Sequence, residues 1–193
     1  MRRSALALVG VAVALTVALA LPVFAGPGEH VDPNDTTGRL DVRVVTYDTD
    51  TGPLTWRFTT FGRWTASQIW DRGYLLVQLD TRGDERIDYV VVVGSDGREL
   101  VATLLRVRRD GQQVEFGSIG ADKDGPRAAS VSVALHKLSI GANRTSFSWS
   151  ALTSFTGTVC RRTCFDLVPD VGVVEEPLPG VTPTPSTSPS PAG

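Results

Sequence analysis

The sequence is poor in the residues on which most protein chemistry depends. Its 193 residues include two histidines, two cysteines and one methionine, and only two of its 19 basic residues, Lys123 and Lys137, are lysines. Phosphate binding requires a concentrated basic surface, whereas the bases of this chain are scattered among 21 acids, so we expect no nucleic-acid partner. The two histidines, His30 and His136, lie too far from each other and from the cysteines to give the ligand spacing of a zinc site.

The chain also lacks the arrangements that nucleophilic catalysis needs. It contains no Gly-x-Ser-x-Gly elbow, and its histidines are separated by 106 positions, so no serine or cysteine stands beside an obvious base. Paired carboxylates can hydrolyse glycosides, but the acids that stand out here lie on one hairpin without a second, separated partner. We therefore do not expect an enzyme.

After residue 25 the chain has no apolar run long enough to span a membrane. Residues 1–25 contain two early arginines, then an uncharged apolar run over residues 5–21, and they end in Ala25. This order is typical of a secretory signal peptide, helical and cleaved after Ala25. An uncleaved membrane anchor is the alternative, because about 17 to 20 apolar residues can also span a bilayer. We expect a secreted, extracellular protein, either free or associated with the cell wall.

Cys160 and Cys164 follow this export signal, and exported cysteines are oxidised by default. A disulfide between them closes a very small loop and contributes only about 2 kcal/mol in the chain-entropy model, so its expected role is to fix one turn. A redox-active pair, with Arg161 and Arg162 lowering the thiol pKa, is the alternative.

From Leu40 onward the hydrophobic pattern has a period of two, and turn residues recur at short intervals. Asp96-Gly97 and Asp110-Gly111 are typical of tight hairpins, which demand a positive φ, and residues 65–73 predict one helical turn or a structured loop. The predicted strands comprise residues 40–48, 54–64, 74–80, 87–94, 98–109, 114–120, 128–138 and 144–155. Eight or nine short strands without a long helix predict an all-β, antiparallel sandwich of the jelly-roll type.

Composition divides the chain into four parts: a signal peptide (1–25), a lead-in (26–39), the β-sandwich (40–176) and a tail (177–193). The tail is rich in proline, threonine and serine, so it cannot bury a core and is predicted to be disordered. The remaining length and the 41% apolar content suffice for one core. We expect a monomer with no membrane span after cleavage.

The stretch LDTRGDERIDYVVVV (79–93) concentrates carboxylates beside the most apolar strand. Asp80 and Asp88 flank a loop that joins two predicted strands, so they should lie nearly opposite each other, where like charges repel. Calcium could neutralise them with Asp80, Asp84 and Asp88 as ligands. Further ligands could come from elsewhere, and the candidates are Asn34, Asp35, Asp41, Asp48 and Asp50.

A second hypothesis needs no metal in this acidic stretch. Arg82 and Arg86 lie in the same loop and could form charge-assisted hydrogen bonds with the aspartates. The sequence leaves both hypotheses open.

Tryptophans offer a candidate binding surface. Trp64 and Trp70 flank the irregular segment 65–69 and are predicted to be exposed, where flat rings could stack on sugars; a role in the core is the alternative. We interpret the protein as a non-catalytic binding module for a polysaccharide or another cell-envelope component. The alternative is a structural or protein-interaction domain of the cell surface without a small ligand.

The order of these segments, from LDVRVV at residue 40 to CRRTCFDLVPD at residue 160, resembles a group of secreted actinobacterial proteins. More distantly, residues 38–170 are similar to the jelly-roll sandwiches of the DOMON and family nine carbohydrate-binding-module type, in which an Asp-Thr-x-Gly-Asp hairpin is typical. The resemblance implies calcium or carbohydrate binding, as in some members. His136 stands where those sandwiches commonly have proline. Haem is not expected, because the haem-binding branch needs an axial methionine and the only methionine is Met1.

Overall fold

The computed structural model describes residues 28–49, 52–141, 143–160 and 162–178. Eleven strands, one short helix and one 3₁₀ turn occupy these ranges. In chain order they are β1 (Glu29–Val31), β2 (Val42–Asp48), β3 (Leu54–Thr60), α1 (Ala66–Ile69), β4 (Gly73–Asp80), β5 (Tyr89–Ser95), β6 (Leu100–Val107), β7 (Gln113–Asp122), β8 (Ala128–Val133), η1 (Leu135–Lys137), β9 (Ser146–Phe155), β10 (Cys164–Val168) and β11 (Val174–Pro177).

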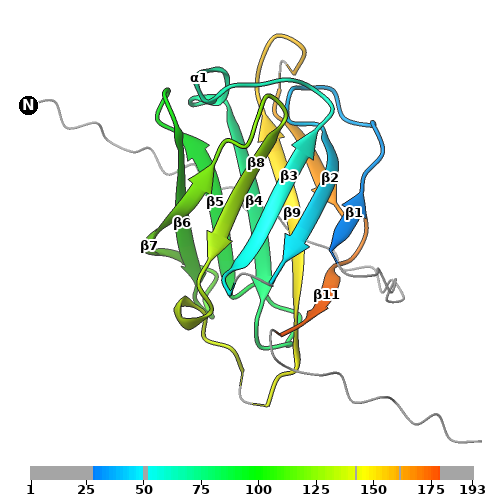
Figure 1. Ribbon diagram of the computed structural model, residues 1–193. Coiled ribbons are helices and arrows are strands. Elements are labelled where there is room, and N and C mark those ends of the chain that lie inside the picture. The colour runs from blue at the N-terminus through cyan, green and yellow to red at the C-terminus, as the bar shows by residue number, and fades with distance from the viewer. Residues whose placement is uncertain (1–27, 50–51, 142, 161, 179–193) are drawn as a thin grey trace, which may run out of the picture.

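All strand pairs are antiparallel, and the strands form one sheet in the order β1-β2-β3-β8-β7-β6-β5-β4-β9-β10, with β11 added to β9. The sheet curls over on itself, so that β1, β2, β3 and β8 face β6, β5, β4 and β9 (Figure 1). The long strand β7 joins the two halves, because its first part pairs with β6 and its last residues pair with β8. The result is close to a barrel, with its two edge strands β1 and β10 brought to the same side.

The core fills the space between the two halves. Every second residue of β3, from Leu54 through Trp56 and Phe58, is buried, as the alternating pattern predicts. Across the core, the ring of Trp56 lies 6.3 Å from that of Trp149 on β9, centroid to centroid. Tyr47 on β2 contacts both tryptophans. These rings therefore join the two halves of the sheet.

The predicted all-β antiparallel class is confirmed, and each of the eight predicted strands has a counterpart. The strand count exceeds the prediction, because β1, β10 and β11 are short and carry charged residues or proline, which hide a strand pattern. The strand order also differs from that of a jelly roll, which winds as two Greek keys, because β4 to β8 are neighbours in simple chain order. Within the segment 65–73, Ala66–Ile69 form the single helical turn α1, and Gly97 and Gly111 adopt the positive φ expected of the two hairpins.

Strands lie on both sides of the predicted 40–176 domain. β1 belongs to the lead-in and pairs with β2, while β11 reaches Pro177 at an edge where a missing N–H is tolerated. The predicted signal peptide and nearly all of the predicted tail lie outside the described residues. Within the described ranges, no helix has the length and apolar character needed to cross a membrane.

Candidate metal centre

A group of aspartates lies at the seam where the two edges of the curled sheet meet. Asp32 follows β1, Asp41 precedes β2, and Asp166 lies in the middle of β10. Hydrogen bonds cross the seam: the Val42 amide donates to Asp166 Oδ2 at 2.6 Å, and the Thr36 hydroxyl donates to the Phe165 carbonyl at 3.1 Å. Side chains therefore hold this seam in place of a regular strand ladder.

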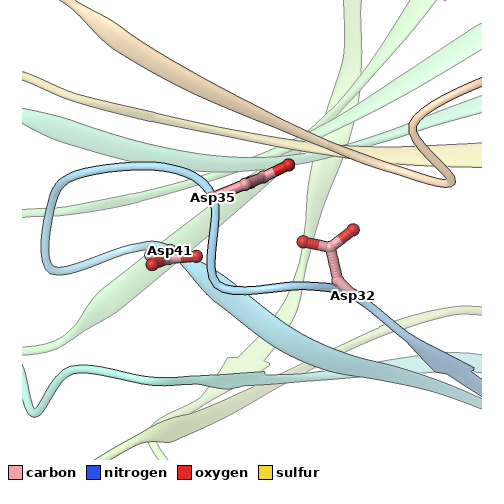
Figure 2. A group of neighbouring side chains, drawn as sticks. All are labelled: Asp32, Asp35 and Asp41. Carbon is pink, nitrogen blue, oxygen red and sulfur yellow. The ribbon is translucent and has the colours of Figure 1, made fainter.

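Asp32, Asp35 and Asp41 face a common space from the loop between β1 and β2 (Figure 2). One carboxylate oxygen of each residue lies within 4.8 Å of one oxygen of the other two. The Asp32 side chain is 2% exposed and that of Asp41 is 4% exposed, whereas Asp35 is exposed. The group is thus largely buried, with one side open to solvent.

The buried carboxylates of this group lack the partners that buried charges need. Within the described ranges, no hydrogen bond reaches either carboxylate oxygen of Asp32, and none reaches Oδ1 of Asp41. The ion pairs of the same ranges involve Glu176, Asp124 and Asp88, so no arginine or lysine neutralises the seam aspartates there. Burying an ionised carboxylate without a partner costs several kcal/mol, and such groups normally pair or coordinate a metal.

The same crowding perturbs the acid–base equilibria of the aspartates. The pKa of Asp32 is raised to about 7, first by burial and then by the negative charges of Asp166, Asp170, Asp35 and Asp41. Burial, followed by the charges of Asp166 and Asp35, raises the pKa of Asp41 to about 6. Burial also raises the pKa of Asp166, although the Val42 amide partly offsets it. The folded protein therefore concentrates negative charge here at a cost in stability.

The disulfide supports this loop. Cys160 and Cys164 are bonded, which confirms the predicted bridge, and Cys164 begins β10, the strand that carries Asp166. A Cβ atom at Gly38 would lie 3.4 Å from Cys160 Sγ, so the loop that carries the aspartates packs directly on the bridge. Gly38 also has φ +147°, where a side chain would be strained.

These residues match the ligands that calcium prefers. Ca²⁺ takes six to eight oxygen ligands, largely carboxylates, in flexible geometry. Asp32, Asp35 and Asp41 supply converging carboxylates, with Asp166 and Asp170 close enough to act on them electrostatically. No histidine or thiol belongs to the group, which disfavours zinc and other soft metals.

The acidic hairpin predicted from the sequence joins β4 to β5. It follows the last residue of β4, whereas the first residue of β4, Gly73, lies near the seam aspartates. Leu79 pairs with Tyr89, so Asp80 and Asp88 face each other across the hairpin as predicted. An oxygen from each of Asp80, Asp84 and Asp88 also lies within 4.8 Å of the others. Asp35 and Asp41, named as additional ligands for this hairpin, belong instead to the seam group, because the turn after β1 places them at the other end of the sheet.

Unlike the seam group, this hairpin neutralises much of its own charge. Asp80 accepts hydrogen bonds from the amides of Arg82, Gly83 and Glu85. Asp88 accepts from the Thr81 amide and hydroxyl and pairs with the Arg82 guanidinium at 3.2 Å. The contacts of Arg82 agree with the arginine hypothesis, whereas Arg86 forms no ion pair in the described ranges. Calcium at this hairpin stays a prediction.

The two predicted aromatic platforms have different environments. The ligand-platform prediction for Trp64 is wrong and its core alternative is confirmed: the residue is 1% exposed, its Nε1 donates to the Thr60 hydroxyl at 3.1 Å, and the Lys123 ammonium lies over its ring. Because Trp64 is buried, its ring cannot stack on a ligand. Trp70 is 54% exposed and lies against Gly97, and its proposed ligand role stays a prediction.

Sequence reasoning named Asp35 and Asp41 as candidate ligands but missed Asp32 and Asp166. They are distant in sequence and meet only when the sheet closes. One signal was present: Asp32 begins the same acidic segment, DPNDTTGRLD (32–41), that contains Asp35 and Asp41, and Asp170 follows four residues after Asp166.

Comparisons with protein-family models, with curated proteins and with solved structures gave no match for this chain.

Proposed function

We propose that this protein is an exported, non-catalytic binding module whose seam aspartates, Asp32, Asp35 and Asp41, bind calcium. The proposal is carried by one observation: the almost fully buried carboxylate of Asp32 has no hydrogen-bond partner within the described ranges and faces two further carboxylates. A divalent cation would supply the missing counter-charge, and calcium suits an all-oxygen ligand set.

Calcium at this position would link the two edges of the curled sheet. Asp32 and Asp41 belong to the β1–β2 side of the seam, and Asp166 belongs to β10 on the other side. A cation held between them would tie the two edges of the sheet together where backbone pairing between β2 and β10 is lacking. The disulfide next to Gly38 would keep the loop in place for binding.

The export and ligand class of the proposal rest on sequence features. Residues 1–25 have the order of a signal peptide, and a disulfide fits an oxidising compartment. Kinship with the DOMON and family nine carbohydrate-binding sandwiches is proposed on the Asp-Thr-x-Gly-Asp hairpin at residue 80 alone, since the strand order differs from that of their jelly roll. A polysaccharide or cell-envelope component is the proposed ligand class, and a purely structural cell-surface domain is the alternative.

The test is the thermal midpoint of the purified protein in calcium-free buffer and in millimolar calcium. A ligand at about 100 times its dissociation constant adds roughly 2.7 kcal/mol, which corresponds to a shift of about 5 to 10 °C for a domain of this size. We expect this shift in the parent protein and in Asp84→Asn, but not in Asp32→Asn.

The two variants separate the two acidic groups. If Asp84→Asn abolishes the shift and Asp32→Asn keeps it, calcium binds the hairpin and the seam proposal fails. If no variant and no calcium concentration up to about 10 mM changes the midpoint, calcium has no role and the structural alternative is favoured.

A further inference from the structure

A groove lined with arginines lies at the end of the sheet away from the seam. Its lining includes Arg106 and Arg108 near the end of β6, Arg109 in the following turn, Val114 and Phe116 on β7, and Arg82 of the acidic hairpin. The β6–β7 hairpin forms one side of the molecule in Figure 1, and β7 carries mostly exposed side chains. The groove is therefore open to solvent and separate from the seam group.

Three of these arginines are available to a ligand. Within the described ranges, Arg106, Arg108 and Arg109 form no ion pair, and their guanidinium groups donate no hydrogen bond. All three are exposed, whereas Arg82 is already paired with Asp88. No acidic residue of the described chain lines the groove, so it is locally positive on a protein of net negative charge. Planar guanidinium groups recognise carboxylates in bidentate geometry.

The groove also presents an aromatic face. Phe116 is the unpaired residue of a β-bulge, because Leu104 pairs with Gly117 and Leu105 with Glu115. Phe116 is 50% exposed, and its ring makes a T-shaped contact with the ring of Tyr89 at 6.3 Å between centroids. Bulges commonly re-aim a side chain, and an exposed ring beside Val114 offers an apolar surface for the face of a sugar.

We propose that this groove binds an acidic polysaccharide, with Arg106, Arg108 and Arg109 contacting carboxylates and Phe116 contacting the sugar rings. The combination selects the ligand: cations alone would suit any polyanion, and an exposed ring alone would suit any sugar. This inference rests on the proposed function for one point, that the ligand is a polysaccharide. Binding in the groove needs no calcium and uses none of the seam aspartates. In this proposal Phe116, instead of the buried Trp64, is the aromatic residue that contacts the sugar.

The test measures binding of the full protein to soluble polygalacturonate oligomers in calcium-free buffer at about 0.1 M salt. We expect saturable binding that weakens as salt rises. Replacing Arg106 and Arg108 together by serine should weaken binding at least tenfold, and Phe116→Ser should weaken it about threefold or more. Arg43→Ser, which removes an exposed arginine from β2 on the other half of the sheet, is the matched control and should bind normally.

Two further probes separate charge from sugar. Methyl-esterified polygalacturonate has the same rings without the charges and should bind at least tenfold more weakly. Polyglutamate has carboxylates without sugar and should bind weakly, with no dependence on Phe116. The proposal is overturned by absence of binding to polygalacturonate, by equal loss in Arg43→Ser, or by polyglutamate binding as tightly. None of these outcomes affects the calcium-dependent midpoint, so the two proposals can fail separately.

Discussion

Replacing Asp32 with asparagine should stabilise the calcium-free protein. At about pH 8 the Asp32 carboxylate is ionised, although its pKa is raised to about 7 by burial and by four neighbouring carboxylates. Its ordinary value is 3.8, and each pKa unit corresponds to about 1.4 kcal/mol. Folding with a charged Asp32 therefore costs at most about 4 kcal/mol. Because the asparagine amide must still find acceptors, we expect a net gain of roughly 1 to 3 kcal/mol.

The same substitution should remove the response to calcium, so the effect of Asp32→Asn changes sign with the metal. For a domain of this size, 1 to 3 kcal/mol corresponds to a rise in midpoint of about 2 to 12 °C in calcium-free buffer. In millimolar calcium the parent should gain stability and the variant should not, so their difference narrows or reverses. Urea unfolding at about pH 8, with and without calcium, measures both effects.

Two controls make the result decisive. Asp84→Asn removes one acid from the exposed part of the other acidic group and should change the stability of the calcium-free protein by less than about 0.5 kcal/mol. Asp32→Ala removes the charge but leaves a cavity, so it should stabilise less than Asp32→Asn does. The reasoning is refuted if Asp32→Asn destabilises the calcium-free protein by more than about 1 kcal/mol while preserving the calcium response. That result would mean that Asp32 has a partner that the described contacts do not include.

Acidity, the disulfide and the hairpin arginines each allow a further test. In calcium-free buffer the stability of the protein should fall as pH rises from about 4 to 7, because Asp32 and Asp41, with their raised pKa, bind their protons more tightly in the folded state. The calcium-induced shift should be smaller at about pH 5.5 than at pH 8, because protons compete with the cation for the carboxylates. Thermal scans across pH measure both effects. Replacing Cys160 and Cys164 by serine should lower stability by about 2 kcal/mol and weaken calcium binding several-fold by calorimetry, and unchanged affinity would show that the loop does not depend on the bridge. Arg82→Ala should cost about 1 to 2 kcal/mol in urea unfolding, since buried Asp88 loses its charged partner, while Arg86→Ala should be nearly neutral; equal costs would contradict the arginine hypothesis.

Strand positions could be predicted where each strand carries its own pattern. Leu54, Trp56 and Phe58 alternate with polar residues, so their shared burial follows from the pleat alone. The same reasoning fails for β1 and β11, whose sequences EHV and VEEP contain few apolar residues. These segments become strands because β2 and β9 offer them unpaired backbone groups. Their pairing is a tertiary effect that no local pattern records.

The aromatic residues show a similar limit. Trp64 and Trp70 stand six positions apart beside the same irregular segment, and their sequence contexts are alike. Their environments differ because the Pro126 carbonyl accepts a hydrogen bond from the Trp64 amide, which draws the end of β3 and Trp64 under the β7–β8 connection. Trp70 ends α1 and extends over Gly97 instead. Exposure of a tryptophan next to a loop thus depends on which distant backbone covers it.

The two acidic groups show why the density of acids in a sequence is a poor guide to a metal site. The hairpin group is dense in sequence, and the same tight turn that brings Asp80 and Asp88 together also delivers backbone amides and Arg82 to them. The seam aspartates Asp32, Asp35 and Asp41 are spread over one loop between β1 and β2, and Asp166 reaches them from the distant strand β10. Unlike the hairpin turn, this loop directs no backbone amide of the described ranges to either oxygen of Asp32 or to Oδ1 of Asp41, so these oxygens lack a donor. A cation stabilises a carboxylate only slightly when the loop's own amides already bind it. A buried carboxylate without a hydrogen-bond donor is stabilised much more, because the cation supplies its only counter-charge. The stronger calcium response should therefore come from the group that the sequence makes less conspicuous.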